Sequence, residues 1–194
     1  MGSKSRLHFL LNDLQSPINI GQCLRAAETY GIDLHIHDPR KITADADMLR
    51  TISDFSCGAW ERRAFRGVNG AAAFLRSHPG RVVATCLCPT AVRLPAFRFE
   101  PDDMVVFGNE YDGLGPDILD LADEKLYVPM PAACLPKPRS GKPIDPSRTH
   151  GVQRNGLPNL NVAVTAGIIA YAHACWAEDA VHARRPSMRE PALS

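Results

Sequence analysis

Short hydrophobic runs alternate with longer amphipathic segments along most of the chain. One run, Val105-Val106-Phe107, is typical of a strand buried on both faces, and it ends at Gly108. The strands that the pattern predicts are 7–11, 34–37, 63–66, 82–87, 104–107 and 125–128. Strands that alternate with helices are typical of a parallel sheet, so we expect an α/β fold.

The amphipathic segments predict helices at about 18–30, 45–53, 68–77, 115–123 and 160–179. Ser16-Pro17 is a typical start for the first of them, because serine caps a helix and proline suits its first turn. The residues expected to face the sheet are Ile20, Leu24 and Ala27. A second, more polar stripe of the same helix holds Gln22, Arg25 and Thr29.

Size and charge describe an ordinary globule. The chain has 194 residues, of which 45% are hydrophobic and 22% charged, and we expect a single domain over residues 1–194. Its formal net charge is only +1. Any site for a polyanion must therefore come from local clustering of basic residues.

Cysteine spacing and hydropathy bear on the compartment. The six cysteines include no C-x-x-C pair, so we expect reduced thiols and no metal site. No secretory signal opens the chain, and the longest apolar stretch, 162–177, contains His173 and is too short to span a bilayer. We therefore expect a cytoplasmic protein with a buried helix at 162–177 and no membrane contact.

The segment 131–158 differs from the rest of the chain. It is rich in proline and glycine, lacks an apolar period and is longer than most loops of compact domains. Segments of this kind are usually functional or disordered insertions. Its basic residues, opposed by Asp145 alone, are Lys137, Arg139, Lys142, Arg148 and Arg154. We expect Arg139, Lys142, Arg148 and Arg154 to bind RNA if the protein binds RNA. A second candidate patch contains Arg62, Arg63 and Arg66.

Three stretches carry the candidate chemistry. They are Asn19-Ile20-Gly21-Gln22-Cys23-Leu24-Arg25, then Phe107-Gly108-Asn109-Glu110-Tyr111-Asp112-Gly113-Leu114, then Val128-Pro129-Met130 with Asn159-Leu160-Asn161-Val162-Ala163-Val164 beyond the insertion. Each follows a predicted strand, and open α/β sheets bind their ligands beyond the carboxyl ends of strands. Taken singly, Asn19 and Asn161 are typical helix caps and Glu110 is typical of an exposed loop. Only the combination indicates a site.

In this order the stretches resemble the three motifs of the SpoU–TrmH family of RNA 2′-O-ribose methyltransferases, part of the SPOUT superfamily. The matching patterns are N-x-G-x-x-x-R, then G-N-E-x-x-G-L after a hydrophobic strand, then V-P-M and L-N-V-x-V. The resemblance covers residues from about 7 to 176. It implies an α/β parallel-sheet domain of SPOUT type with helices on both faces and a carboxyl-terminal trefoil knot. It also implies a homodimer that uses S-adenosyl-L-methionine as cofactor.

The resemblance assigns roles to individual residues. At the reacting centre it implies Asn19, Arg25, Glu110 and Asn161. Around the cofactor it implies Gly108, Asn109, Gly113, Val128, Met130, Asn159 and Leu160. It implies no metal. Two positions depart from the family pattern, which has serine at Asn159 and a small hydroxyl residue at Ala163. The family also lacks the basic insertion, which has three open interpretations: it covers the cofactor, binds RNA or blocks the site.

Arg25 has two alternative roles in such a reaction, as a base or as an electrostatic stabiliser. A guanidinium has a pKa above about 12, which makes it a poor base. We therefore favour a charged Arg25, oriented by Glu110, that holds a phosphate or stabilises the developing alkoxide.

Other classes of function remain for comparison. A non-catalytic RNA-binding or assembly protein that retains the knotted fold is the alternative, and Asn159 and the insertion favour it. A nicotinamide-dependent dehydrogenase is disfavoured because no G-x-G-x-x-G follows a strand. Few residues precede the first strand, so we expect no separate amino-terminal RNA-binding domain and favour transfer RNA over ribosomal RNA as substrate.

Overall fold

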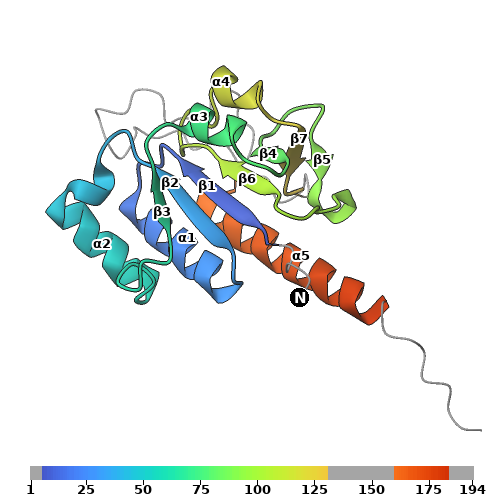
Figure 1. The fold of residues 1–194 in the computed structure, drawn as a ribbon. Coiled ribbons are helices and arrows are strands. Elements are labelled where there is room, and N and C mark those ends of the chain that lie inside the picture. The colour runs from blue at the N-terminus through green and yellow to red at the C-terminus, as the bar shows by residue number, and fades with distance from the viewer. Residues whose placement is uncertain (1–5, 131–159, 184–194) are drawn as a thin grey trace, which may run out of the picture.

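A parallel seven-stranded sheet forms the centre of the molecule in the computed structural model, which describes residues 6–130 and 160–183 (Figure 1). The strands are β1 (His8–Asn12), β2 (Asp33–His37), β3 (Arg66–Val68), β4 (Val82–Thr85), β5 (Val92–Arg93), β6 (Met104–Phe107) and β7 (Glu124–Tyr127). Their order across the sheet is β3-β2-β1-β6-β4-β7-β5, and every adjacent pair is parallel. The predicted α/β parallel sheet is confirmed.

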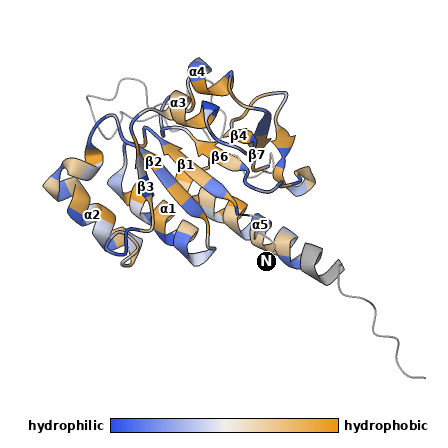
Figure 2. Cartoon of the chain, in the orientation of Figure 1, coloured by the Kyte–Doolittle hydropathy of each residue, from blue (hydrophilic) through white to orange (hydrophobic). Residues whose placement is uncertain are grey.

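Helices cover both faces of this sheet, as predicted (Figure 1). They are α1 (Pro17–Thr29), α2 (Ala46–Ser56), α3 (Ala71–Arg76), α4 (Pro116–Leu119) and α5 (Val162–Ala183), with short 3₁₀ turns η1 (Ile42–Ala44) and η2 (Leu94–Ala96). Phe9 and Leu11 of β1 pack in the core under α1 and α5, whereas Leu10 packs in the core under α3 and α4. This alternation is the two-residue period of a strand buried on both faces. The centre of the sheet is accordingly hydrophobic (Figure 2).

The first helix forms as its sequence indicates. Ser16 is its N-cap and Pro17 lies in its first turn, while Ile20, Leu24 and Ala27 are buried against the sheet. Gly21 allows α2 to approach closely, because a Cβ atom there would lie 2.7 Å from the carbonyl oxygen of Ile52. The backbone of α1 is thus fixed between the sheet and α2.

Several element boundaries differ from the prediction. The strand expected at 63–66 is Arg66–Val68, because Arg63 adopts a left-handed φ of 52° and pairing with β2 begins only at Arg66. The helix expected at 115–123 is a single turn, Pro116–Leu119, and the strand expected at 82–87 ends at Thr85. The two-residue strand β5 was not predicted, because its hydrophobic run is too short to show a period.

Two further expectations concern a membrane span and the trefoil knot. None of the described helices is long and apolar enough to cross a bilayer. A knot depends on the path of the entire chain, and residues 131–159 lie outside the described part. The trefoil knot therefore stays a prediction.

Candidate active site and cofactor cavity

Side chains from three distant segments meet at the carboxyl ends of β1 and β6. The amide nitrogen of Asn19 donates to the Glu110 carboxylate over 2.8 Å, and the amide nitrogen of Asn161 donates to Asn19 Oδ1 over 3.0 Å. Asn19 lies 91 positions from Glu110 in the chain and 142 positions from Asn161. The structure thus brings together three of the four residues expected at the reacting centre.

Glu110 is held at the amino-terminal end of α1. Besides Asn19, its carboxylate accepts the backbone N–H groups of Gln15 at 2.9 Å and Ser16 at 3.0 Å. The start of a helix carries partial positive charge and unpaired N–H groups, so a carboxylate is favoured there. With three donors on its two oxygens, Glu110 has a fixed orientation. It positions Asn19 and gives the network a negative end.

Asn161 belongs to two structures at once. Its side-chain oxygen accepts the N–H of Ala163 at 2.9 Å and caps α5, while one hydrogen of its amide nitrogen goes to Asn19. An amide nitrogen carries two hydrogens. No described residue accepts the second one, and Asn161 lines the neighbouring cavity. This hydrogen is available to a ligand.

The loop after β6 is a tight turn that only glycine fits at its first position. Asn109 and Gly113 exchange backbone hydrogen bonds of 3.2 and 3.1 Å, and Gly113 has a left-handed φ of 69°. A Cβ atom at Gly108 would lie 2.2 Å from the carbonyl carbon of Gly113. The Asn109 side chain accepts the N–H groups of Tyr111 and Asp112, so it braces the loop from inside.

A cavity of about 1020 Å³ opens beside this loop. Its lining includes six residues expected to hold the cofactor, namely Gly108, Asn109, Gly113, Val128, Met130 and Leu160. Glu110 and Asn161 also line it. Asn159, the seventh expected cofactor residue, lies outside the described residues. The volume is that of a pocket for a ligand of drug or cofactor size.

Arg25 lies apart from this network. It is exposed on α1, six residues after Asn19, and its side chain makes no hydrogen bond or ion pair with the described residues. Six helical positions correspond to a rise of about 9 Å and a rotation of about 240°. The carboxylate expected to orient Arg25 is instead bonded to Gln15, Ser16 and Asn19. The expectation that Glu110 orients Arg25 is therefore wrong for this structure.

The basic residues expected to bind RNA have different surroundings. Arg139, Lys142, Arg148 and Arg154 lie outside the described residues. Arg62 is paired with Glu28 of α1 through a 2.6 Å contact of its Nε, and it also donates to the Cys57 carbonyl. Arg62 thus joins α1 to the loop after α2, and an RNA contact through it stays a prediction.

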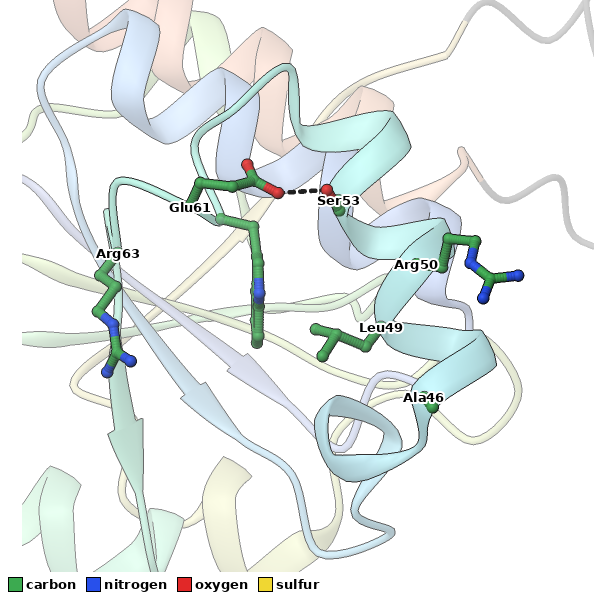
Figure 3. Close-up of a pocket in the computed structure, with 7 residues that line it drawn as sticks. Ala46, Leu49, Arg50, Ser53, Glu61 and Arg63 are labelled. Carbon is green, nitrogen blue, oxygen red and sulfur yellow. Dashed lines mark hydrogen bonds between the residues drawn. The ribbon is translucent and has the colours of Figure 1, made fainter.

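Arg63 is exposed and lines a second cavity of about 530 Å³, between α2 and the loop that follows it (Figure 3). Ser53 donates a hydrogen bond to Glu61 in the wall of this cavity. Arg50, whose side chain is 77% exposed, is a second cation there. Arg63 remains available for the RNA contact that the sequence predicts.

The chain matches a known protein family. Residues 6–134, about two thirds of the chain, match the profile described as the SpoU rRNA Methylase family. The chain belongs to the SpoU family. The match ends within the insertion, after the first two motifs and Val128-Pro129-Met130.

Curated SpoU relatives modify both transfer RNA and ribosomal RNA. The chain is 28% identical over 110 residues to a tRNA (guanosine(18)-2′-O)-methyltransferase of Aquifex aeolicus, covering 57% of this chain and 41% of that protein. It is 29% identical over 165 residues to the 23S rRNA (guanosine-2′-O-)-methyltransferase RlmB of Acinetobacter baylyi, covering 83% and 56%. The chain therefore spans about half the length of the curated relatives it matches.

Solved SpoU structures share the fold. The Aquifex aeolicus TrmH/SpoU tRNA modifying enzyme superimposes with a TM-score of 0.69 at 20% identity, covering 96% of this chain and 83% of that one. A structure described as giving insights into the 2-OH methylation of C/U34 on tRNA has a TM-score of 0.67 at 26% identity, covering 91% and 99%. These likenesses confirm the SPOUT-type fold expected from the sequence.

Sequence reasoning missed part of the SpoU site. Thr85, Cys86 and Leu87, at the end of β4, line the cavity together with Thr165 and Ile169 of α5. Asp13, after β1, accepts two hydrogen bonds from Arg40 at 2.8 and 3.1 Å and one from Asn109 at 3.4 Å. The general signal was present, because both segments follow the carboxyl ends of strands. No motif marked them.

The described residues include no group of three or more histidine, cysteine, aspartate or glutamate side chains arranged to hold a metal ion.

Proposed function

We propose that this SpoU protein transfers a methyl group from S-adenosyl-L-methionine to a ribose 2′-hydroxyl in RNA. The observation that carries the proposal is the hydrogen-bonded chain Glu110–Asn19–Asn161, which ends at the wall of the cavity with an open amide hydrogen. Segments separated by more than half the chain converge on one point there. A structural role alone would not require the polar end to face a cavity.

The cavity suits an adenosyl group. Gly108 keeps the loop wall close to the sheet, since any larger residue would displace Gly113. Phe107, Leu126 and Ile169 supply apolar walls for a base, and the backbone at Gly108, Val128 and Leu160 supplies polar groups for its edge. When bound, the cofactor supplies a methyl group on a sulfonium. Met130 and Leu160 would hold it from the two sides of the insertion.

The residues of the chain then position the ribose. In-line displacement requires the hydroxyl oxygen to lie opposite the leaving sulfur, and it builds negative charge on that oxygen. The open amide hydrogen of Asn161 stabilises this charge, and Asn19 and Glu110 keep the amide from rotating. Glu110 acts in this proposal as a positioning residue, because its carboxylate oxygens accept hydrogen bonds from Gln15, Ser16 and Asn19.

A homodimer completes the site in this proposal. Val164, Ile168 and Tyr171 form one exposed apolar stripe of α5, with Tyr171 59% exposed. On the neighbouring α1, Ile18 and Tyr30 are also exposed. Exposed apolar side chains gathered on neighbouring elements are typical of an interface. Arg25 follows Ile18 by seven positions and so lies on the same face of α1, and dimerisation through this face would bring it towards the partner subunit.

Transfer RNA is the substrate that we favour over ribosomal RNA. The relatives include both kinds of enzyme, and the structure described for C/U34 of tRNA is matched by this chain over 99% of its length. The two chains match over most of their lengths, which supports the same kind of substrate.

Mapping of 2′-O-methyl nucleotides by mass spectrometry tests the proposal. Purified protein, S-adenosyl-L-methionine and unmodified transfer or ribosomal RNA are combined, and the RNA is digested. We expect one methylated nucleotide in transfer RNA with wild-type protein and at least about 100-fold less with Asn161→Ala. Binding of RNA without methylation of any RNA would instead favour the non-catalytic assembly protein.

A further inference from the structure

Two thiols lie side by side where β4 ends. Cys86 follows the last residue of β4, and Cys88 lies two positions further along, where the chain bends. Their Sγ atoms are 2.9 Å apart. Both cysteines are free and partly accessible. The pair therefore needs little movement to form a bond.

The backbone holds this pair in place from both sides. The N–H of Cys86 continues the pairing with β7 by donating to the Leu126 carbonyl at 3.1 Å. After Cys88 the chain turns, and the N–H of Ala91 donates to the Cys88 carbonyl at 3.0 Å, with Pro89 at the position that β-turns favour for proline. The two thiols are thus fixed between a strand and a turn.

The two thiols differ in acidity. Burial raises the pKa of Cys86 to about 12, and the hydrogen bond with Cys88 adds to this. Burial alone would raise the pKa of Cys88 as well, but hydrogen bonds from Cys86 and Thr90 outweigh it and lower the pKa. Cys88 is accordingly the nucleophile and Cys86 the protonated partner, the division of roles typical of redox-active thiol pairs.

We propose that Cys86 and Cys88 form an oxidisable dithiol in the wall of the cofactor cavity, which peroxides convert to an intramolecular disulfide. Cys86 and the neighbouring Leu87 line the cavity. Closing the bond draws the sulfur atoms from 2.9 Å to about 2.05 Å and shifts Leu87. The disulfide itself is independent of the enzyme's activity, whereas its effect on cofactor binding rests on the proposed function.

The chemistry needs only a peroxide. The Cys88 thiol first gives its proton to solvent. Its thiolate then attacks one peroxide oxygen, the O–O bond breaks, and the leaving hydroxide takes up that proton to become water, which leaves Cys88 as a sulfenic acid. The Cys86 sulfur then attacks the Cys88 sulfur, and the S–O bond breaks as the S–S bond forms. The proton of Cys86 goes to the leaving hydroxide. In total, two thiols lose two electrons and one hydrogen peroxide becomes two molecules of water.

Tryptic mapping of the full-length protein tests the disulfide directly. Cleavage after Arg81 and Arg93 releases peptide 82–93, which contains both cysteines and no others. After hydrogen peroxide we expect this peptide to lose two hydrogen atoms and resist alkylation, and dithiothreitol should restore both thiols. Exposed Cys57 serves as the internal control and should not lose two hydrogens. A peptide 82–93 that stays fully alkylated at doses that oxidise Cys57 would overturn the proposal.

Single variants separate the two roles. In Cys86→Ser we expect Cys88 to stop at a sulfenic acid that dimedone traps, and in Cys88→Ser we expect Cys86 to remain a thiol. Cys57→Ser should leave disulfide formation unchanged. Equal trapping at position 86 in Cys88→Ser would contradict the assignment of the nucleophile.

Titration with S-adenosylhomocysteine measures the effect on the cavity. We expect roughly tenfold weaker binding after oxidation, reversed by dithiothreitol, and no change in peroxide-treated Cys86→Ser. Equal affinity of the oxidised and reduced forms would overturn the link to the cavity. Absence of binding in both forms, with the disulfide present, would count against the proposed function and not against the dithiol.

Discussion

At the carboxyl ends of the strands, hydrogen bonds join Glu110 to Asn19 and Asn19 to Asn161. One amide hydrogen of Asn161 stays available at the wall of a cavity. At the amino ends, Arg81 and the fully buried Asp103 bind each other through two hydrogen bonds of 2.9 Å, so this pair is satisfied within the protein. Both regions hold charged groups inside the same sheet. They differ in whether the network ends in the protein or at a cavity.

The amino ends of the strands also lie beside a cluster of histidines. The rings of His8 and His78 lie 5.2 Å apart, and His35 lies 5.8 Å from His8. Both ring nitrogens of buried His35 lack a hydrogen-bond partner among the described residues. Buried polar groups without partners lower stability. We therefore expect substitutions at the amino ends of the strands to change stability most, and substitutions at the carboxyl ends to change activity most.

The largest expected effect is on stability, at the amino ends. Asp103→Ala leaves the Arg81 guanidinium, which is only 25% exposed, without its buried partner. We expect a loss of about 3 kcal/mol in the free energy of unfolding, measured by urea denaturation. Glu100→Ala is the matched control, because Glu100 contacts the same arginine at 2.9 Å from an exposed position, and it should cost less than about 1 kcal/mol. Equal costs for the two variants would refute the burial argument.

The next effect is on catalysis, at the carboxyl ends. Glu110→Ala removes the acceptor of Asn19 and of two backbone N–H groups, so the amide of Asn161 loses its fixed orientation. We expect kcat to fall about 100-fold while the melting temperature changes far less than in Asp103→Ala. The conservative change Glu110→Gln should restore part of kcat, because it keeps one acceptor oxygen. Full activity of Glu110→Ala would remove the network from the mechanism.

A pH effect on stability should come from His35. Burial is the main cause that lowers its pKa to about 4, and the neighbouring His8, Arg66 and His78 lower it further while Asp33 opposes them. The unfolded chain therefore takes up a proton near pH 6.5 that the folded protein refuses until about pH 4. Stability should fall by about 3 kcal/mol as the pH drops through this window.

Urea denaturation at several pH values measures this effect. His35→Phe should flatten the loss between pH 6.5 and pH 4. His37→Phe, on the same strand, is the control, because the His37 ring has a hydrogen-bonding partner in Asn12 at 2.8 Å. The wild-type slope should persist in that variant. A slope that is the same in His35→Phe would assign the pH dependence to other groups.

The smallest expected effect concerns Arg25. Arg25→Lys keeps the charge but loses the planar fork of the guanidinium, and we expect kcat/KM to fall about tenfold with unchanged stability.

Ile168→Glu places a charge in the exposed apolar stripe of α5 and should yield monomers by analytical ultracentrifugation. Mixing Arg25→Lys with Asn161→Ala should restore some activity if Arg25 acts across the dimer. No recovery in mixed dimers would place Arg25 in its own subunit's site.

Local patterns explain how far the sequence could predict this molecule. The run 104–107 is apolar at every position, so β6 was predictable as a buried strand, whereas β5 has only two residues. Asn19, Glu110 and Asn161 could be expected to converge because each follows a strand of one parallel sheet. The partners of Glu110 could not be predicted from the sequence, because two of them are backbone N–H groups whose direction depends on how α1 begins. The pairing of Asp13 with Arg40 and Asn109 depends likewise on a left-handed backbone at Asp13.

Co-crystallisation with S-adenosylhomocysteine tests the central claim most directly. We predict density for the adenosine against Gly108, Val128 and Leu160, with the sulfur facing the amide of Asn161. Density for the ligand elsewhere on the protein, or a sulfur facing away from Asn161 in every subunit, would contradict the account.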